Sequence, residues 1–188
     1  MHEEVGEVLI PAHRIADRVR ELGGLLADAY AGREVVVVAI MKGCVLFLAD
    51  LVRAWGEASG PGVAAMDLEF VSAQSYEGTR PRRAGVRVTL PEGIEARIAG
   101  RPVLVLDDIF DTGRTLAAVC RRLERMGALE LKTLVLLAKR RAAPREPPIP
   151  RPDWVGFEIE DRFVIGYGLD YRGRWRNLPY VAALRRES

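Results

Sequence analysis

Acidic and small polar residues crowd into one short stretch of the chain. The adjacent carboxylates Asp107 and Asp108 are followed by Asp111 and then by the loop of residues 112–115, which contains Gly113 and two threonines. Carboxylates can accept hydrogen bonds from sugar hydroxyls, help to hold Mg²⁺ or take up a proton. The loop hydroxyls and backbone N–H groups can hold a phosphate, because glycine allows close approach of the backbone. The stretch therefore predicts a site for a phosphorylated sugar.

The residues on either side of this cluster predict the elements that position it. The short apolar run Val103–Leu106 is rich in β-branched residues and is typical of a parallel strand covered on both faces. A helical pattern begins near Leu116 and ends at Gly127. The N-terminus of such a helix carries partial positive charge that attracts phosphate. The cluster is thus expected between the end of a strand and the start of a helix.

A second strand–loop–helix unit precedes the first. Residues 35–41 form an apolar run, Lys42 and Gly43 interrupt it, and residues 45–55 have an amphipathic helical pattern. In open parallel sheets the loops at the carboxyl ends of the strands line the ligand crevice. Lys42 and Gly43 are therefore expected near the loop at 107–115.

The remaining pattern alternates strands with helices. A helix is predicted from Pro11 to about residue 29, and residues 77–85 form a polar loop with glycine, proline and arginine that is expected to be mobile. The alternation predicts an α/β domain with a largely parallel central sheet flanked by helices and a small lobe from the terminal segments. Further strands are predicted at residues 7–10, 66–72, 86–90, 131–138, 154–159 and 163–165.

Length and composition limit the classes of protein. A chain of 188 residues fits a single domain over 1–188. Cys44 and Cys120 lie in apolar segments, so they are expected to be reduced, as in a cytoplasmic protein. A net charge of +2 gives no general case for nucleic-acid binding. The longest apolar run, residues 35–41, is too short to span a membrane.

The run LDDIFDTGRTL resembles the phosphoribosyl-pyrophosphate (PRPP) binding motif of the type I phosphoribosyltransferases. The wider resemblance covers nearly the whole chain and is to the hypoxanthine–guanine group of that family. It is carried by IMKGCVLFLADL at 40–51, SY at 75–76, the Lys139-Arg140 pair, and VGFEIEDRFVIGYGLDYRGRWRNLPY at 155–180. It implies the type I phosphoribosyltransferase fold, with a hood lobe, and Mg²⁺-dependent transfer of phosphoribose from PRPP to hypoxanthine and/or guanine, yielding IMP or GMP and pyrophosphate.

The resemblance also assigns the residues that would bind PRPP. Lys42 and Gly43 would form the pyrophosphate loop, in which a strained or cis peptide turns backbone N–H groups toward the leaving group. Asp107 and Asp108 would bind the ribose hydroxyls and, directly or through water, Mg²⁺. The remaining PRPP-side residues are Thr112, Gly113, Arg114 and Thr115 for the 5′-phosphate, Asp170 as a second metal-side carboxylate, and Arg176 for the pyrophosphate.

The resemblance places the purine beside a different set of residues. Asp111 would take the proton from the five-membered ring as the new bond forms, and Lys139 would donate to the 6-oxo group. Phe163 would stack on the base, and Val164 would offer backbone groups to its edge. The lid, at about 75–86 and beginning with Ser75 and Tyr76, would close over the site and exclude water. From position alone, Lys139 could equally be an exposed lysine and Phe163 a core residue.

Two parts of the sequence depart from the family pattern. The first acid of the PRPP motif is usually Glu, whereas Asp107 is one methylene shorter, so its reach to a ribose hydroxyl needs water or a backbone adjustment. The loop has Arg83-Ala84-Gly85 where Ser-Ser-Gly is common. These departures bear on sugar binding and on lid kinetics.

Two other functions compete with phosphoribose transfer to hypoxanthine or guanine. A PRPP-sensing, RNA-binding regulator of the same fold is conceivable from the basic loops at 80–83 and 140–151, although no aromatic-interleaved basic patch suggests stacked RNA bases. The second alternative is a xanthine-preferring transferase, and the choice depends on how Val164 and its surroundings interact with the second substituent of the purine. PRPP and a 6-oxopurine are the expected partners, with neither a membrane nor nucleic acid, and a homodimer or homotetramer is expected from the relatives.

Overall fold

A computed structural model of the chain describes residues 4–60, 65–76, 85–140 and 150–185. The expected mobile lid therefore lies outside the described residues over 77–84. Most of the basic loop at 140–151 lies outside them as well.

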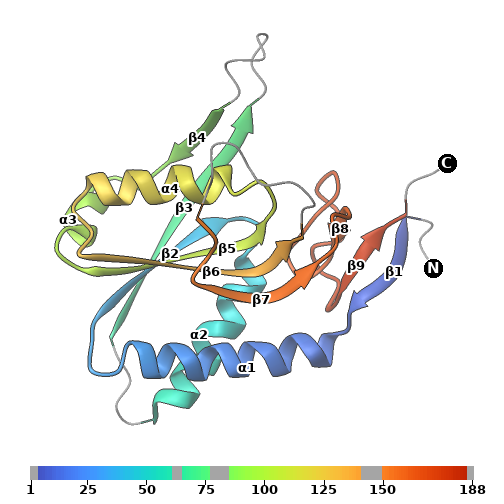
Figure 1. Ribbon diagram of the computed structural model, residues 1–188, viewed down its shortest axis with the longest axis horizontal. Helices are drawn as coiled ribbons and strands as arrows, with labels where there is room; N and C mark the ends of the chain where they lie inside the picture. The colour runs from blue at the N-terminus through green and yellow to red at the C-terminus, as the bar shows by residue number, and fades with distance from the viewer. Residues whose placement is uncertain (1–3, 61–64, 77–84, 141–149, 186–188) are drawn as a thin grey trace.

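Six strands form the central sheet, in the order β4-β3-β2-β5-β6-β7 (Figure 1). All neighbours in this sheet are parallel except the β3–β4 pair, which is antiparallel. Both faces of the central strands are buried, which explains their continuous apolar runs. The strands are β2 (Val35–Met41), β3 (Met66–Tyr76), β4 (Gly85–Thr89), β5 (Pro102–Phe110), β6 (Glu130–Lys139) and β7 (Trp154–Ile159).

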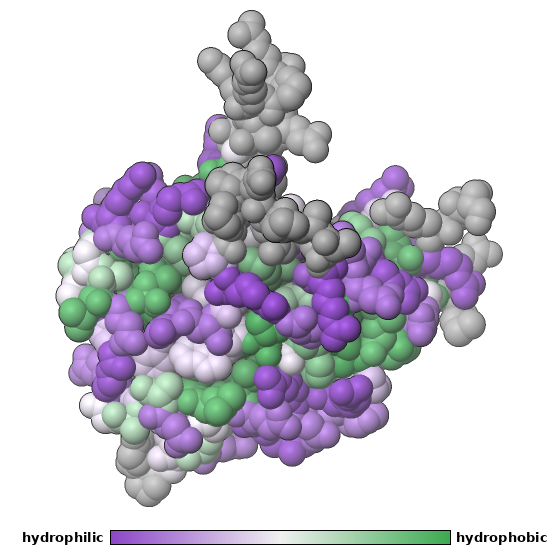
Figure 2. Space-filling view, in the orientation of Figure 1, coloured by the Kyte–Doolittle hydropathy of each residue, from purple (hydrophilic) through white to green (hydrophobic). Residues whose placement is uncertain are grey.

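Helices cover both faces of the sheet. Helices α1 (Ala12–Ala29) and α2 (Val45–Ser59) pack on one face, and α3 (Ile94–Ile98) and α4 (Arg114–Arg125) lie on the other (Figure 1). Each face has its own core: Leu22, Phe47 and Trp55 belong to the first, Val119 and Leu123 to the second. The fold is thus the predicted α/β arrangement of a sheet between two layers of helices. In the view of Figure 2 its surface mixes hydrophilic residues with several hydrophobic patches.

A second, smaller sheet joins the two ends of the chain. It has the order β1-β9-β8, with β1 (Val5–Ile10), β9 (Val181–Leu184) and β8 (Val164–Ile165) paired antiparallel. The backbone N–H of Arg185 donates to the carbonyl of Glu4 at 2.9 Å. This sheet confirms the predicted lobe built from terminal segments.

The observed elements differ from the predicted ones mainly in length. Strand β5 continues past Leu106 to Phe110, because its ladder with β6 runs on through Asp107 and Ile109 despite the polar side chains. Helix α4 begins at Arg114, two residues earlier than predicted, and β3 extends to Tyr76. Helix α3 and strand β9 are too short to show a period and were not predicted. Among the described residues, no helix has the length and apolar character needed to cross a membrane.

Candidate active site

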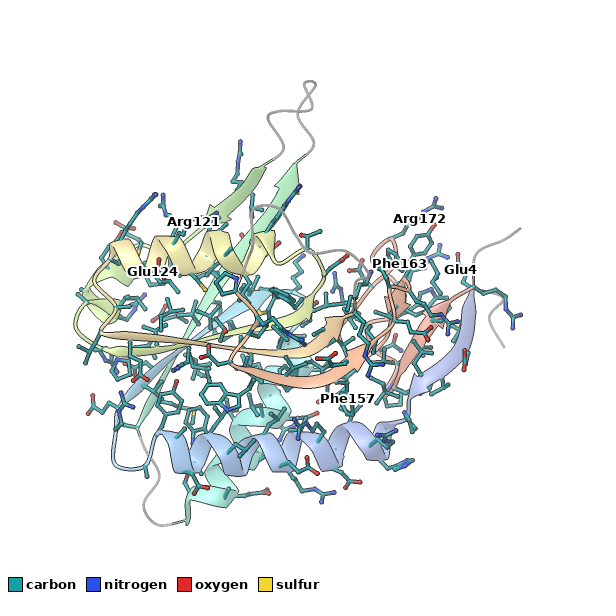
Figure 3. The ribbon with its side chains drawn as sticks, viewed as in Figure 1. Glu4, Arg121, Glu124, Phe157, Phe163 and Arg172 are labelled. Atoms are coloured by element: carbon teal, nitrogen blue, oxygen red, sulfur yellow. The ribbon has the colours of Figure 1, made fainter. Side chains whose placement is uncertain are left out.

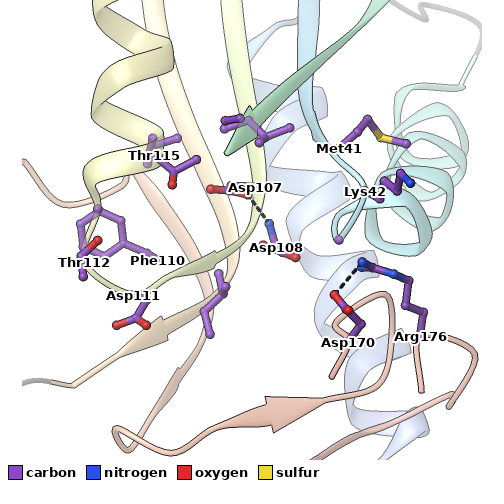
Figure 4. Close-up of a pocket in the computed structure, with 16 residues that line it drawn as sticks. Met41, Lys42, Asp107, Asp108, Phe110, Asp111, Thr112, Thr115, Asp170 and Arg176 are labelled. Carbon is purple, nitrogen blue, oxygen red and sulfur yellow. Dashed lines mark hydrogen bonds and ion pairs between the residues drawn. The ribbon is translucent and has the colours of Figure 1, made fainter. Parts of the chain in front are cut away.

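A cavity of about 420 Å³ opens at the carboxyl ends of β2 and β5 (Figure 4). Ten of the residues predicted to act in the site line it, drawn from three separated parts of the chain. They are Lys42, Gly43, Asp107, Asp108, Asp111, Thr112, Gly113, Thr115, Asp170 and Arg176. The remaining lining residues are mostly apolar: Ile40, Met41, Ala73, Ile109, Phe110 and Leu116.

The β5–α4 loop forms one wall of the cavity. Gly113 adopts a left-handed conformation with φ of 76°, and α4 begins at the next residue. No side chain caps this helix N-terminus, although the Arg114 N–H donates to Thr112 Oγ1 at 3.4 Å. The first turn of α4 therefore offers backbone N–H groups and a positive dipole end to an anion.

The adjacent acids at the end of β5 have unusual electrostatics. The Asp107 side chain is buried, and its Oδ1 accepts a hydrogen bond from the Asp108 N–H at 3.0 Å. Burial, together with the neighbouring Asp108 carboxylate, raises the pKa of Asp107 well above its usual range. Burial also raises the pKa of Asp108, while its hydrogen bonds and the positive charge of Arg176 act in the opposite direction. A hydroxyl donor or a cation in the cavity would favour the charged forms of both acids.

Two glycines allow the loop after β2 to approach its neighbours. A Cβ atom at Gly43 would overlap Oδ2 of Asp108, and a Cβ atom at Gly168 would overlap the carbonyl oxygen of Gly43. Gly168 also has a φ of 98°, which favours glycine. The peptide bond between Met41 and Lys42 is cis. The β2–α2 loop is therefore held between β5 and the loop that follows β8.

An ion pair from the β8–β9 segment forms the opposite wall. Arg176 Nη2 lies 2.6 Å from Asp170 Oδ1, and Arg176 Nη1 donates to the carbonyl of Gly168 at 2.6 Å (Figure 4). Asp170 Oδ2 also accepts from the Gly173 N–H at 2.7 Å. Both side chains are thus held by contacts within the protein, with a guanidinium and a carboxylate facing one cavity.

The residues predicted to meet the purine lie beside the cavity. Among the described residues, the lining does not include Lys139, Phe163 or Val164. Lys139 Nζ lies 3.3 Å from Oδ2 of Asp111, and Asp111 lines the cavity. Val164 is buried in β8, whereas Phe163 is 42% exposed beside the small sheet, with its ring edge-on to Tyr171 (Figure 3). Because so much of its ring is exposed, Phe163 is not a core residue, although its position in the sequence was compatible with one.

Three other predicted residues lie at the start of α4 and at the end of β3. Arg114 is exposed in the first turn of α4. Ser75 and Tyr76 end β3, where their backbones pair with Val86 and Gly85 of β4. Residues 77–84 of the expected lid lie outside the described residues.

Two residues near the site were not predicted individually. Asp161 lies 3.1 Å from Lys139 Nζ, and Gly168 contacts the backbone of Gly43. Both fall within the 155–180 run that carries the resemblance, but their partners are distant in sequence. Only the tertiary structure reveals these contacts, because no local pattern marks them.

The site has the donors for an ion that arrives with a ligand. Among the described residues, no group of three or more His, Cys, Asp or Glu side chains could hold a metal alone. Magnesium typically uses one or two carboxylates together with water and substrate phosphates. Asp107, Asp108 and Asp170 around one cavity fit that mode of binding.

A family model, curated relatives and solved structures all point to the same family. The phosphoribosyl transferase domain model matches residues 8–172. The hypoxanthine-guanine phosphoribosyltransferase of Staphylococcus epidermidis is 34% identical over 189 residues, covering 100% of this chain and 98% of the relative. The bifunctional protein TilS/HprT of Listeria monocytogenes is 35% identical over 187 residues, and this chain spans 27% of its length.

Solved structures show the same relationship. A hypoxanthine phosphoribosyltransferase from Staphylococcus aureus superposes with a TM-score of 0.81 at 32% identity, covering 98% of this chain and 94% of the other. A substrate complex of the Trypanosoma cruzi hypoxanthine phosphoribosyltransferase gives a TM-score of 0.83 at 31% identity, covering 98% and 97%. The fold, the cavity at the ends of β2 and β5, and these full-length matches agree: the chain belongs to the phosphoribosyl transferase family.

Proposed function

We propose that this chain is a purine-salvage enzyme that transfers phosphoribose from PRPP to hypoxanthine and/or guanine. The products would be IMP or GMP and pyrophosphate. One observation carries this proposal: an anion-binding helix start, an acid pair and an Arg–Asp pair share one cavity, and a lysine contacts Asp111 at its edge. Relatives named hypoxanthine-guanine phosphoribosyltransferase support it, and the comparisons do not favour the RNA-binding alternative.

PRPP would bind across the two walls of the cavity. The 5′-phosphate would accept hydrogen bonds from the loop of residues 112–115 and the first turn of α4. The ribose hydroxyls would donate to Asp107 and Asp108. Arg176 and the Lys42-Gly43 loop would meet the pyrophosphate, a role that suits the fixed and permanently charged guanidinium.

The carboxylates around the cavity would hold Mg²⁺ together with the pyrophosphate. We assign this role to Asp107, Asp108 and Asp170, because all three line the space that the diphosphate would occupy. The ion, when bound, would neutralise negative charge that develops on the leaving group.

Asp111 and Lys139 would act on the purine. A bond forms between a ring nitrogen and the anomeric carbon as the bond from that carbon to pyrophosphate breaks. Asp111 would accept the proton that the five-membered ring loses. Lys139 has only donors, so it would bind a 6-oxo group and oppose the 6-amino group of adenine. Such a mismatch at a buried site can discriminate by about 10⁴.

The remaining predicted residues would complete the enclosure of the base. The exposed ring of Phe163 is available to stack on a purine, and the backbone of Val164 would contact the purine edge. Ser75 and Tyr76, at the end of β3, would begin the lid that excludes water from the transition state.

A direct assay tests the proposed reaction. The protein is incubated with PRPP, Mg²⁺ and each of hypoxanthine, guanine, xanthine and adenine, and nucleotide products are separated by chromatography. IMP or GMP should form, adenine should give no comparable product, and a chelator should abolish turnover. Formation of neither IMP nor GMP would overturn the proposal, whereas dominant XMP formation would favour the xanthine-preferring alternative.

The proposal extends to the location of the protein in the cell and to its oligomeric state. Cys44 and Cys120 are free thiols, which supports a reducing cytoplasmic compartment. We propose a homodimer or homotetramer, and light scattering coupled to size-exclusion chromatography would measure the assembled mass.

A further inference from the structure

The ammonium group of Lys139 lies between two carboxylates from different elements. Its Nζ is 3.3 Å from Oδ2 of Asp111, in the β5–α4 loop, and 3.1 Å from Oδ1 of Asp161, in the β7–β8 turn. The Lys139 side chain is only 11% exposed, while those of Asp111 and Asp161 are 43% and 51% exposed. One nearly buried cation is therefore shared by two acids that solvent still reaches.

Backbone hydrogen bonds fix Asp161 in this position. Strands β6 and β7 stay in register to their last residues, where Lys139 pairs with Ile159. The Arg140 N–H donates to the Ile159 carbonyl at 2.7 Å, and the Arg162 N–H donates to the Glu160 carbonyl at 2.8 Å. These bonds flank Asp161 on both sides, so its carboxylate meets Lys139 from a defined turn.

The two carboxylates compete for the same ammonium. If Asp111 were the sole partner, Lys139 Nζ would move toward it and neutralise the group that has to accept a proton. The same movement would shift the donor from the place where a purine oxygen should lie. Asp161 opposes this movement, because it attracts the ammonium toward the β7–β8 turn.

We propose that Asp161 is a positioning residue for purine recognition. It holds Lys139 Nζ where the ammonium can donate to the 6-oxo group, and it leaves Asp111 able to accept the proton. The inference rests on the proposed function and adds to it a residue that contacts neither PRPP nor the base.

Steady-state kinetics of Asp161→Asn test the position of the ammonium. The KM for hypoxanthine should rise about five- to tenfold, as expected for the loss of one charge-assisted contact, while the KM for PRPP stays within about twofold. Asp161→Glu should restore part of the loss. Asp17→Asn is the matched control, because the Asp17 carboxylate is exposed to a similar extent and pairs with Arg20 on α1, far from the cavity.

A double-mutant cycle separates positioning from a general structural effect. In a Lys139→Met background, Asp161→Asn should change the affinity for IMP by less than about twofold, because the residue that it positions is absent. Titration calorimetry with IMP provides this readout even where turnover is slow. An equal loss in both backgrounds would overturn the proposal, as would an unchanged hypoxanthine KM in Asp161→Asn.

Two further measurements keep the outcomes distinct. Thermal melts identify a variant that fails to fold, in which case Asp161→Ser is measured instead. A wild-type protein that forms no nucleotide defeats the proposed function itself. An active wild type with an unaffected Asp161→Asn rejects only the role of Asp161.

Discussion

The two walls of the cavity are built in different ways. The wall at the end of β5 is continuous in sequence, running from Asp107 through Gly113 to the first turn of α4. The opposite wall is built from two segments that lie far apart in the chain, one with Lys42 and Gly43 and the other with Asp170 and Arg176. Local strand, loop and helix geometry suffices for the first wall. The second wall requires the small sheet to dock against the β2–α2 loop.

Substitution at Asp111 should give the largest effect and tests the continuous wall. We expect Asp111→Asn to lower the single-turnover rate by about 10²-fold or more, because an amide cannot accept the proton, while PRPP affinity stays within a few-fold. Rapid-quench measurement of IMP formation provides the rate, with Asp17→Asn as control. An unchanged rate would end the assignment of Asp111 as the base.

Adding one methyl group at Gly43 should break the assembled wall. A Cβ atom there would overlap the Asp108 carboxylate, so we expect Gly43→Ala to weaken PRPP binding by about 30-fold and to lose about 1–3 kcal/mol of unfolding free energy. Binding is measured by calorimetry and stability by urea unfolding.

Gly56→Ala is the matched control for this change. Nothing lies within 4 Å of a Cβ atom at Gly56 in α2, so this variant should be more stable by about 0.5–1 kcal/mol. If both variants behave alike, the close packing of the β2–α2 loop is not what shapes the wall.

Replacing the guanidinium of Arg176 tests how this side chain contributes to PRPP binding at the same wall. Arg176→Lys keeps the charge but cannot contact Asp170 and the Gly168 carbonyl from a planar fork. The KM for PRPP should rise about tenfold, with the KM for hypoxanthine nearly unchanged. Arg20→Lys on the surface of α1 is the control, and an equal rise in both constants would mean that Arg176 supports the fold as a whole.

A smaller effect is expected in stability rather than activity at Asp107. The folded state keeps this proton to a higher pH than the unfolded state, which loses it near pH 4, so the free energy of unfolding falls as pH rises above about 4. Asp107→Asn removes the cost of burying the charge. At pH 7.5 the free energy of unfolding and the Tm of this variant should exceed those of the wild type, although PRPP binding weakens.

Melting curves at two pH values check this prediction. The gain should shrink as the pH falls toward 4 and vanish below about pH 3, where Asp107 is protonated in both states. Asp17→Asn should show no such gain. A lower Tm for Asp107→Asn at pH 7.5 would mean that the charged form is stabilised inside the fold.

The difference between the walls also explains what sequence could predict. The alternation of apolar runs and helical periods predicted the parallel sheet, its helices and the lobe from the chain ends, all of which the structure confirms. The predicted end of β5 at Leu106 was wrong, because backbone pairing with β6 continues where the side chains become polar. Hydrophobic patterning reports burial, and Asp107 is a buried residue that the pattern counts as exposed.

Prediction of the site was limited by contacts between distant segments. The loop of residues 112–115 was identifiable from its own composition, and the strand–loop–helix pattern placed Lys42 near it. The resemblance added Asp170 and Arg176, and the structure gathers all of them around one cavity. The Asp161–Lys139 pair and the Gly43–Gly168 contact have no local signature. Their partners meet only after the sheets have formed and docked.

The pairing of β1 with β9 has a consequence for synthesis on the ribosome. Within the described chain, β1 joins a sheet only through β9, with Ile10 paired to Val181. At translation rates of about 5–20 residues per second, β1 waits about 10–35 s for β9, its partner strand. Asp170 and Arg176 also emerge late. The nascent chain can therefore complete its phosphate loop well before it acquires the second wall of the cavity.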